Sequence, residues 1–276
     1  MDPRSIDQSS VDRNAGGEED FLYPWEFGEQ ERFFHHWTST GSTMDRAREL
    51  AGRGCPGGTV ITAEAQTAGR GRNGRCWMSH PGGLFFTLLE RPRCPVRDAP
   101  LLGMAAQIAA AETLSALCGA EVSLKWPNDL FLGGKKIGGI LSELYGEGDR
   151  IQWIALGIGL NLNNPVPPGE SANCADFLEH PLPRRLVLLR FLETWRGIQS
   201  ACPGREELRK RWNRRSLGMG QRVLVVPGDH GNFGFPRERV RGRGIFLGID
   251  GSGRGLIQSG GGVLRISPGA ASLRFM

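Results

Sequence analysis

The chain contains 276 residues, has a formal net charge of +5 at pH 7 and is 39% hydrophobic. Because domains typically contain roughly 100 to 200 residues, this length allows one large or two unequal domains with a packed core, and it excludes a chain that is disordered throughout. No segment approaches the ~18 consecutive apolar residues of a membrane span, and the polar, acidic amino terminus lacks the apolar region of a signal peptide. We therefore expect a cytoplasmic protein with no membrane partner.

Cysteine and glycine usage narrows the classes further. The six cysteines are scattered without a CxxC pair, which argues against a zinc ribbon, a redox dithiol or a small disulfide scaffold. Glycine, with 41 residues, reaches about twice its usual fraction of about 7%. We therefore expect loops defined by their backbone to be important for function.

The amino-terminal part is predicted to hold a leader, a helix and two strands. Residues 1 to about 20 are rich in Ser, Asp, Glu and Gly and contain little that could be buried, so we expect a disordered or loosely attached leader, to which we assign residues 1–34. A helix capped by Ser42 or Thr43 is predicted to end at the next glycines. The β-branched run 59–63 and the apolar run 84–89 are predicted strands, separated by a loop rich in glycine and arginine.

The middle of the chain mixes helices and strands irregularly. Alanine-rich residues 101–118 have apolar spacings of three and four and predict the clearest helix. Because helix-length segments do not separate the strands regularly, we expect an α+β sheet with helices on one face rather than a doubly wound parallel sheet. The further predicted elements are strands at 122–126, 136–144 and 153–162 and helices at 184–201 and 205–216.

The composition changes sharply at Leu217. Short β-like runs separated by glycine follow, without a helical period, and they predict a small β-barrel. We therefore expect a catalytic domain at 35–217 and a second domain at 218–276.

The clearest chemical motif is Gly69-Arg70-Gly71-Arg72-Asn73-Gly74-Arg75. It contains GxGxxG, but no helix is predicted after it, so it does not fit a dinucleotide-binding fingerprint. The glycines allow close approach to backbone N–H groups, and the arginines supply forked donors for carboxylate and phosphate oxygens. The motif therefore predicts an anion-binding loop that is mobile until its anion arrives.

Two motifs contain lysine: one lies at the end of a predicted strand, and the other lies at the beginning of the next. Lys125-Trp126-Pro127-Asn128-Asp129 leaves a predicted strand at a proline, and its Asn and Asp could anchor the turn or, through Asp129, help to hold Mg²⁺ carried by nucleotide phosphates. In 133–141 (GGKKIGGIL), lysines border an apolar strand, where lysine is uncommon without a partner. Paired glycines in this strand leave room for a flat ligand or another backbone.

A third glycine motif and several exclusions complete the inventory. In 157–163 (GIGLNLN), glycines alternate with apolar residues, so one face of the strand is bare; ligand binding and close packing both explain this pattern. The sequence has no GxxxxGK[ST] loop, HExxH or GxSxG.

A nucleic-acid-binding module is an alternative function, suggested by basic runs at 209–211, 214–215 and 237–243. Such runs are usually solvated, and a net charge of +5 is weak evidence for a DNA partner.

In this order, the motifs resemble those of the biotin protein ligases (biotin–[acetyl-CoA-carboxylase] ligases). The resemblance covers about residues 37–165 and is weaker over 166–217. It implies a class II synthetase-like catalytic domain, a mixed sheet with helices, followed by a small SH3-like β-barrel. It also implies a ligase-only chain without the amino-terminal repressor domain that some members carry.

The resemblance implies a two-step reaction with biotin and Mg-ATP as substrates. The carboxylate of biotin attacks the α-phosphate to give biotinyl-5′-AMP, and a lysine of a biotin carboxyl carrier protein domain then takes the biotinyl group. Such a displacement needs orientation and charge neutralisation more than a general base. Whether the enzyme is a monomer or a homodimer is left open by the sequence.

The resemblance also assigns site residues. Lys136, Arg72 and Lys125 are implied as catalytic residues, and Asp129 is the possible ligand for Mg²⁺, with no metal fixed by the protein alone. Biotin-binding residues implied in this way are Ser42, Thr43, Met44, Gln66, Arg70, Gly71, Arg72, Lys136, Gly138, Gly157 and Gly159. Nucleotide-binding residues implied in this way are Arg70, Arg72, Arg75, Trp77, Lys125, Asn128 and Asp129.

The chain departs from the family at Met44. The family usually has Ser-Thr-Asn where this sequence has Ser-Thr-Met, so a side-chain amide is missing and any contact with biotin there comes from the backbone. A lipoate ligase or octanoyltransferase of the same fold is the nearest alternative function. The arginine-rich loop followed by Lys-Trp-Pro-Asn-Asp favours biotin.

Overall fold

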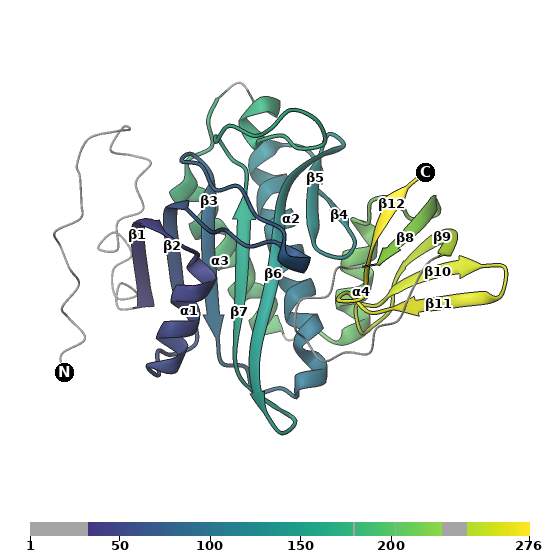
Figure 1. The fold of residues 1–276 in the computed structure, drawn as a ribbon, viewed down its shortest axis with the longest axis horizontal. Helices are drawn as coiled ribbons and strands as arrows, with labels where there is room; N and C mark the ends of the chain where they lie inside the picture. Colours follow the sequence, from purple (N-terminus) through teal and green to yellow (C-terminus); the bar gives the residue numbers. More distant parts are fainter. Residues whose placement is uncertain (1–32, 179, 202, 228–241) are drawn as a thin grey trace.

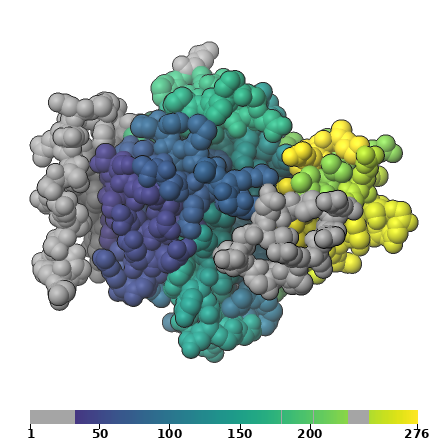
Figure 2. All heavy atoms as spheres, in the orientation of Figure 1, coloured from purple at the N-terminus to yellow at the C-terminus, as the bar shows by residue number. Residues whose placement is uncertain are grey.

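The computed structural model describes residues 33–178, 180–201, 203–227 and 242–276. It contains a seven-stranded sheet followed by a five-stranded sheet, which forms a lobe at one end of the molecule (Figures 1 and 2). The order of the first sheet is β1-β2-β3-β7-β6-β5-β4; β1 and β2 are parallel and the other neighbours antiparallel. Its strands are β1 (Phe34–Thr40), β2 (Thr59–Gln66), β3 (Leu84–Glu90), β4 (Ser123–Lys125), β5 (Asp129–Leu132), β6 (Lys135–Glu147) and β7 (Arg150–Leu160).

Two layers of helix cover the two faces of this sheet. Helix α1 (Thr43–Gly52) packs on one face through a small core that includes Met44, Ala47 and Ile61. Helix α2 (Ala99–Cys118) packs on the opposite face, against α3 (Arg184–Ala201) and α4 (Arg205–Arg214), over the main core. The expectation of helices on one face is therefore wrong for α1, whose small apolar residues fit it closely against β2, β3 and β7.

Helix α2 is apolar because it is a core helix. Among the described residues, the helical stretch Val96–Cys118 alone is long and apolar enough to cross a membrane, and 67% of its most apolar window is buried inside the fold. The alanines at 105, 106 and 109–111 are each at most 6% exposed, which lets the sheet and α3 approach closely.

The second sheet is antiparallel, with the order β11-β10-β9-β8-β12. Trp126, just before β5, donates its indole N–H to the carbonyl of Gly253 at 3.1 Å and is 2% exposed. Apolar residues of this sheet, such as Phe246 and Ile257, join the same core cluster as the main sheet. Its strands are β8 (Arg222–Pro227), β9 (Gly242–Ile249), β10 (Gly255–Ser259), β11 (Gly262–Ile266) and β12 (Ala271–Phe275).

Most predicted elements are confirmed, with two strands added. Strand β1 begins at Phe34, the last residue of the predicted leader, and residues 1–32 of that leader lie outside the described residues. Strand β5 replaces the loop expected after Asp129, because the chain turns back at once to pair with β4. Strand β1 (FHHWTST) is largely polar and β5 (DLFL) has only four residues, so neither has the long apolar run that identified β3.

Candidate active site

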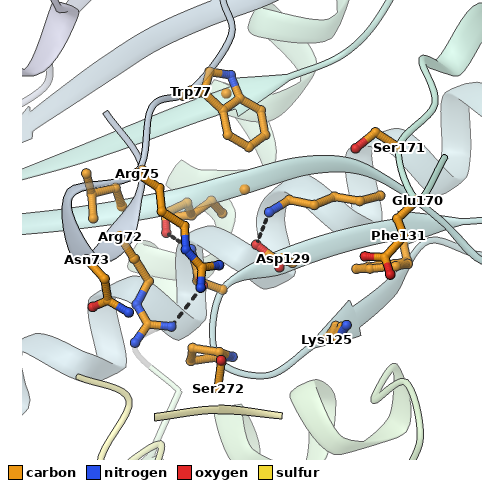
Figure 3. Close-up of a pocket in the computed structure, with 18 of the residues that line it drawn as sticks. Arg72, Asn73, Arg75, Trp77, Lys125, Asp129, Phe131, Glu170, Ser171 and Ser272 are labelled. Carbon is orange, nitrogen blue, oxygen red and sulfur yellow. Dashed lines mark hydrogen bonds and ion pairs between the residues drawn. The ribbon is translucent and has the colours of Figure 1, made fainter. Parts of the chain in front are cut away.

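A cavity of about 940 Å³ opens on the α1 side of the main sheet and extends to the second sheet. Strands β6 and β7 form its floor, and the arginine loop (residues 69–75) and the segment 169–171 contribute to its walls. Figure 3 shows Arg72 and Arg75 on one side, Trp77 above, Lys125 and Glu170 opposite, and Ser272 of the second sheet below. The site is therefore built by segments that are far apart in the sequence.

One end of the cavity is a hydrogen-bonded polar cluster at the start of α1. Ser42 is the N-cap of this helix, and its hydroxyl accepts a hydrogen bond from the backbone N–H of Met44. Thr43 donates its backbone N–H and its hydroxyl to Gln66 Oε1 at 2.8 and 3.2 Å. Ser42 and Thr43 are 1% and 3% exposed. Buried hydroxyl and amide groups of this kind can recognise a polar ring that donates and accepts hydrogen bonds.

The floor is formed by glycines on alternate positions of β6 and β7. Gly139, Gly157 and Gly159 line the cavity, whereas Gly138 does not. A Cβ at Gly138 would lie 2.8 Å from Leu160 Cδ2, on the core side. Because side chains alternate along a strand, the floor position belongs to Gly139 and not to the predicted Gly138.

Two side chains lie over the floor. A Cβ at Gly157 would lie 2.4 Å from the sulfur of Met44, and one at Gly159 would lie 2.6 Å from the indole of Trp77. The space left by the glycines is therefore used in part for close packing. Met44 meets the cavity through its thioether, in addition to its backbone, and gives this end of the floor an apolar patch.

The arginine loop is a compact excursion between β2 and β3. Gly71 donates its N–H to the carbonyl of Arg75 at 2.7 Å, and Trp77 donates to Gly69 at 2.8 Å. A Cβ at Gly69 would lie 2.4 Å from the carbonyl oxygen of Trp77, so this position requires glycine. Asn73, with φ +59°, takes the left-handed conformation at the tip. The loop thus forms a short turn followed by extended chain, without the helix of a dinucleotide site.

Arg72 connects this loop to both parts of the site. Its guanidinium donates to Asn128 Oδ1 at 3.3 Å, to the carbonyl of Pro268 and to the carbonyl of Ala271 at 3.4 Å. Burial lowers the pKa of Arg72 to about 10, and nearby Asp129 partly opposes this effect. Arg72 therefore keeps its positive charge at neutral pH in a partly desolvated position, where a charge acts strongly on a bound anion.

Lys136 and Asp129 form the central ion pair. Lys136 Nζ lies 2.6 Å from Asp129 Oδ1 and 5.3 Å from the centroid of a Trp77 ring. The backbone of Lys136 also pairs with the wall segment, because its N–H donates to Glu170 and its carbonyl accepts from Ala172. The ammonium group is thus held at a fixed place in the cavity.

Lys125 lies between two aromatic rings from different sheets. Its ammonium is 5.2 Å from the centroid of Phe131 and 5.3 Å from that of Phe275. Such cation–π contacts hold a lysine charge without neutralising it. Asn128 donates its side-chain amide to the carbonyl of Ile140 at 2.9 Å, so it anchors the turn as well as Arg72.

The structure brings nearly all the predicted residues together. Their roles toward biotin and ATP remain predictions, and Gly138 is the one that does not line the cavity. The predicted residues that line it are Ser42, Thr43, Met44, Gln66, Arg70, Gly71, Arg72, Arg75, Trp77, Lys125, Asn128, Asp129, Lys136, Gly157 and Gly159.

Sequence reasoning missed several parts of the lining. Gly139 could have been found from strand alternation once the register was known. The segments 169–171 and 272–275 carried no motif, since their place in the wall depends on the tertiary fold. Phe131 was also missed, because it lies on β5, a strand that the sequence did not predict.

Two arginines of the basic run 209–211 are paired within the protein. Arg209 pairs with Glu206, and Arg211 binds both carboxylate oxygens of Glu112 at 2.9 and 2.8 Å. Of the run 237–243, residues 237–241 lie outside the described residues. These internal pairs do not favour a nucleic-acid interface.

Comparisons with known proteins agree with this site. Residues 37–161 match the Biotin/lipoate A/B protein ligase family. Over 236 residues the chain is 32% identical to the bifunctional ligase/repressor BirA of Bacillus spizizenii, covering 82% of this chain and 69% of that protein. It is 33% identical over 233 residues to the biotin–[acetyl-CoA-carboxylase] ligase of Paracoccus denitrificans, covering 78% of this chain and 89% of that protein.

A solved structure supports the same relationship. The fold matches the biotin protein ligase from Aquifex aeolicus in complex with biotin and ATP, with a TM-score of 0.72, 26% identity and coverage of 88% of this chain and 99% of that chain. Fold, cavity and sequence thus define an enzyme of the class that ligates biotin or lipoate to proteins. Within this class, the chain belongs to the biotin protein ligases.

Proposed function

We propose that the protein activates biotin with ATP as biotinyl-5′-AMP and transfers the biotinyl group to one lysine of a biotin carboxyl carrier protein domain. The observation that carries this proposal is a single cavity with a buried polar cluster around Thr43 and Gln66, a glycine floor, and cations at Arg72 and Lys136. A ureido ring fits the polar cluster, and a carboxylate and phosphates fit the cations.

In the first step, the carboxylate of biotin attacks the α-phosphorus of ATP. A bond forms between the carboxylate oxygen and the α-phosphorus, the bond from the α-phosphorus to the oxygen that bridges to the β-phosphorus breaks, and pyrophosphate leaves with that oxygen. Both reactants are anions, so the residues must offset their repulsion and align them. Lys136, held by Asp129, and Arg72 are the groups that supply this positive charge at fixed positions.

In the second step, the ε-amine of the carrier lysine attacks the acyl carbon of the mixed anhydride. The amide forms, AMP leaves with the anhydride oxygen, and the amine gives up a proton. Lys125 would hold the AMP phosphate, because its ammonium lies between Phe131 and Phe275 and, within the described part of the chain, no carboxylate forms a salt bridge with it. The wall segment with Glu170 and Ser171 borders the same part of the cavity.

Magnesium enters with ATP as part of the substrate. Among the described residues, no group of three or more His, Cys, Asp or Glu is arranged to hold a metal ion. Mg²⁺ is commonly bound by one or two carboxylates together with substrate phosphates and water. Asp129, whose carboxylate lines the cavity, is the residue that would add an oxygen ligand.

The polar end of the cavity favours biotin over lipoate. A lipoyl or octanoyl chain carries no donor or acceptor at its far end, so it would leave the buried groups of Ser42, Thr43 and Gln66 without ligand partners. The cysteines within the described ranges have free thiols, which is typical of a reducing compartment and supports the cytoplasm as the place of the reaction.

Transfer to a carrier protein tests the proposal. The purified protein is incubated with Mg-ATP, biotin and a biotin carboxyl carrier protein domain, and the mass of the carrier is measured. We expect the mass to rise by one biotinyl group, and a carrier whose acceptor lysine is replaced by arginine to remain unmodified. An unmodified wild-type carrier, or modification by lipoate instead, would contradict the proposal.

A further inference from the structure

A cluster of four charged side chains lies beside the cavity at the base of the arginine loop. Arg70 Nη1 lies 3.0 Å from Glu143 Oε1, and Arg70 Nη2 lies 3.1 Å from Asp45 Oδ1. Arg48 Nη2 lies 2.8 Å from Glu143 Oε2 and Arg48 Nη1 lies 3.5 Å from Asp45 Oδ1. Of these four residues, Arg70 alone lines the cavity, so its guanidinium reaches partners outside the ligand space.

Glu143 is the centre of this cluster. It lies on β6 on the same face as Gly139 and Leu141, because the three residues are two positions apart. This is the side of the sheet that α1 covers. Its side chain is 15% exposed, whereas those of Asp45 and Arg48 are 46% and 53% exposed. Isolated surface ion pairs contribute little, but a nearly buried carboxylate shared by two arginines forms a network with stronger geometry.

We propose that Glu143 is a positioning residue that holds the arginine loop over the substrates through Arg70. In this arrangement Arg70 binds no phosphate; its guanidinium fastens the loop to α1 and β6. Arg72 and Arg75 are then the residues of this loop that bind the substrate anions. This inference rests on the proposed function, because it assumes that biotin and its adenylate bind beneath the loop.

The cluster also explains how so cationic a loop is held in place. The repulsion among Arg70, Arg72 and Arg75 is offset on one side by the carboxylates of Glu143 and Asp45. On the other side, Arg72 is held by the carbonyls of Pro268 and Ala271. Loss of Glu143 would release one of these two attachments and raise the population of open loop.

An open loop should affect binding more than chemistry. If only part of the population is competent to bind, the apparent dissociation constant rises in proportion to the part that is lost. A residue that supports ground state and transition state equally changes KM and leaves kcat unchanged. We therefore expect Glu143→Gln to raise the KM for biotin about five- to tenfold and to speed loss of the adenylate, with kcat within about twofold of wild type.

The test uses the full chain and a double-mutant cycle. The variants are Glu143→Gln, Arg70→Ala and the double variant. Glu49→Gln is the matched control, because Glu49 is an exposed carboxylate on α1 that pairs with Arg46. Three readouts are measured for each: KM and kcat for biotin-dependent pyrophosphate release, the rate of adenylate release without carrier, and tryptic cleavage after Arg72 and Arg75 without ligand.

The expected result is that both single variants and the double variant share one phenotype, since they break the same connection. Each should show a higher biotin KM and faster tryptic cleavage, while Glu49→Gln resembles wild type. Arg70→Lys should restore most of the wild-type KM. If Glu143→Gln does not fold, Arg70→Ala and Arg70→Lys carry the same test.

Two results would overturn the inference while leaving the ligase function intact. One is a wild-type biotin KM and wild-type cleavage rate in folded Glu143→Gln. The other is a fall in kcat of more than about tenfold in Arg70→Ala alone, which would make Arg70 a direct ligand of the transition state. Absence of pyrophosphate release by the wild-type protein would instead contradict the proposed function.

Discussion

Lys136 Nζ and Asp129 Oδ1 lie 2.6 Å apart in the cavity, on two antiparallel strands of the main sheet. Strands β5 and β6 are neighbours, and a register shift between Leu130 and Phe131 sets the pairing on which both side chains depend. The carboxylate fixes the direction in which the ammonium group points. This pair therefore supplies a positioned cation without a general base.

Replacing Lys136 by alanine should abolish adenylate formation and leave the fold intact. Removing one preorganised charge from a reaction centre typically lowers kcat by about a hundredfold to a thousandfold. Pyrophosphate release with biotin measures this loss, and thermal unfolding measures stability. Lys210→Ala, on the exposed side of α4, is the control. Turnover above about a tenth of wild type in Lys136→Ala would remove Lys136 from the first step.

Alanine at two adjacent glycines of β6 should have opposite effects. At Gly138 the new methyl group meets Leu160 and Leu130 in the core, so we expect a loss of about 1 to 3 kcal/mol in the free energy of unfolding. At Gly139 it enters the cavity 3.3 Å from Trp77, so we expect a higher KM for biotin and nearly unchanged stability. Equal effects of both variants on stability and KM would contradict the assignment of the floor.

Phe275 links the second sheet to the nucleotide part of the cavity. Phe275→Ala removes one of the two rings beside Lys125, an interaction worth about 0.5 to 2 kcal/mol. We expect the KM for ATP to rise severalfold while the KM for biotin stays near that of wild type. Leu264→Ala, on the exposed part of the same sheet, serves as the control. An unchanged KM for ATP would place Phe275 outside the nucleotide site.

Glu90 gives a prediction for the pH dependence of stability. Burial raises the pKa of Glu90 above its ordinary value of 4.5, against hydrogen bonds from Trp195 and Gln199. A raised folded pKa means that this group stabilises the fold below about pH 4.5 and that this contribution is lost as pH rises through the folded pKa. Glu90→Gln keeps an acceptor for Trp195 and removes the charge. The Tm of the variant minus the Tm of the wild type should therefore be more positive at about pH 8 than at about pH 4.5. A more negative difference at about pH 8 would contradict this account of Glu90.

Local sequence patterns were sufficient for much of the fold. The apolar spacing of 101–118 and the run Leu84–Leu89 identify α2 and β3 because helix and strand periods are properties of adjacent residues. The motifs also placed most of the site, since each glycine or arginine loop occupies one short segment. Strand β1 was missed because FHHWTST contains few apolar residues and gains its place by parallel pairing with β2.

The remaining features depend on contacts between distant segments. The choice between Gly138 and Gly139 depends on which face of the sheet lines the cavity, and this cannot be read from the glycine pair itself. The partners of Arg70, Asp45 and Glu143, are 25 and 73 positions away from it in the sequence, so the loop motif alone could not show these ion pairs. Met44 illustrates the same point, because its contact with Gly157 joins a helix to a strand more than 100 residues later.

The central claim is that this cavity adenylates biotin. The most direct measurement is pyrophosphate release from Mg-ATP on mixing with biotin, and separately with lipoate and octanoate, in the absence of any carrier protein. We predict a burst of one pyrophosphate per enzyme with biotin alone. A burst with lipoate or octanoate instead, or none with any of the three acids, would contradict the account.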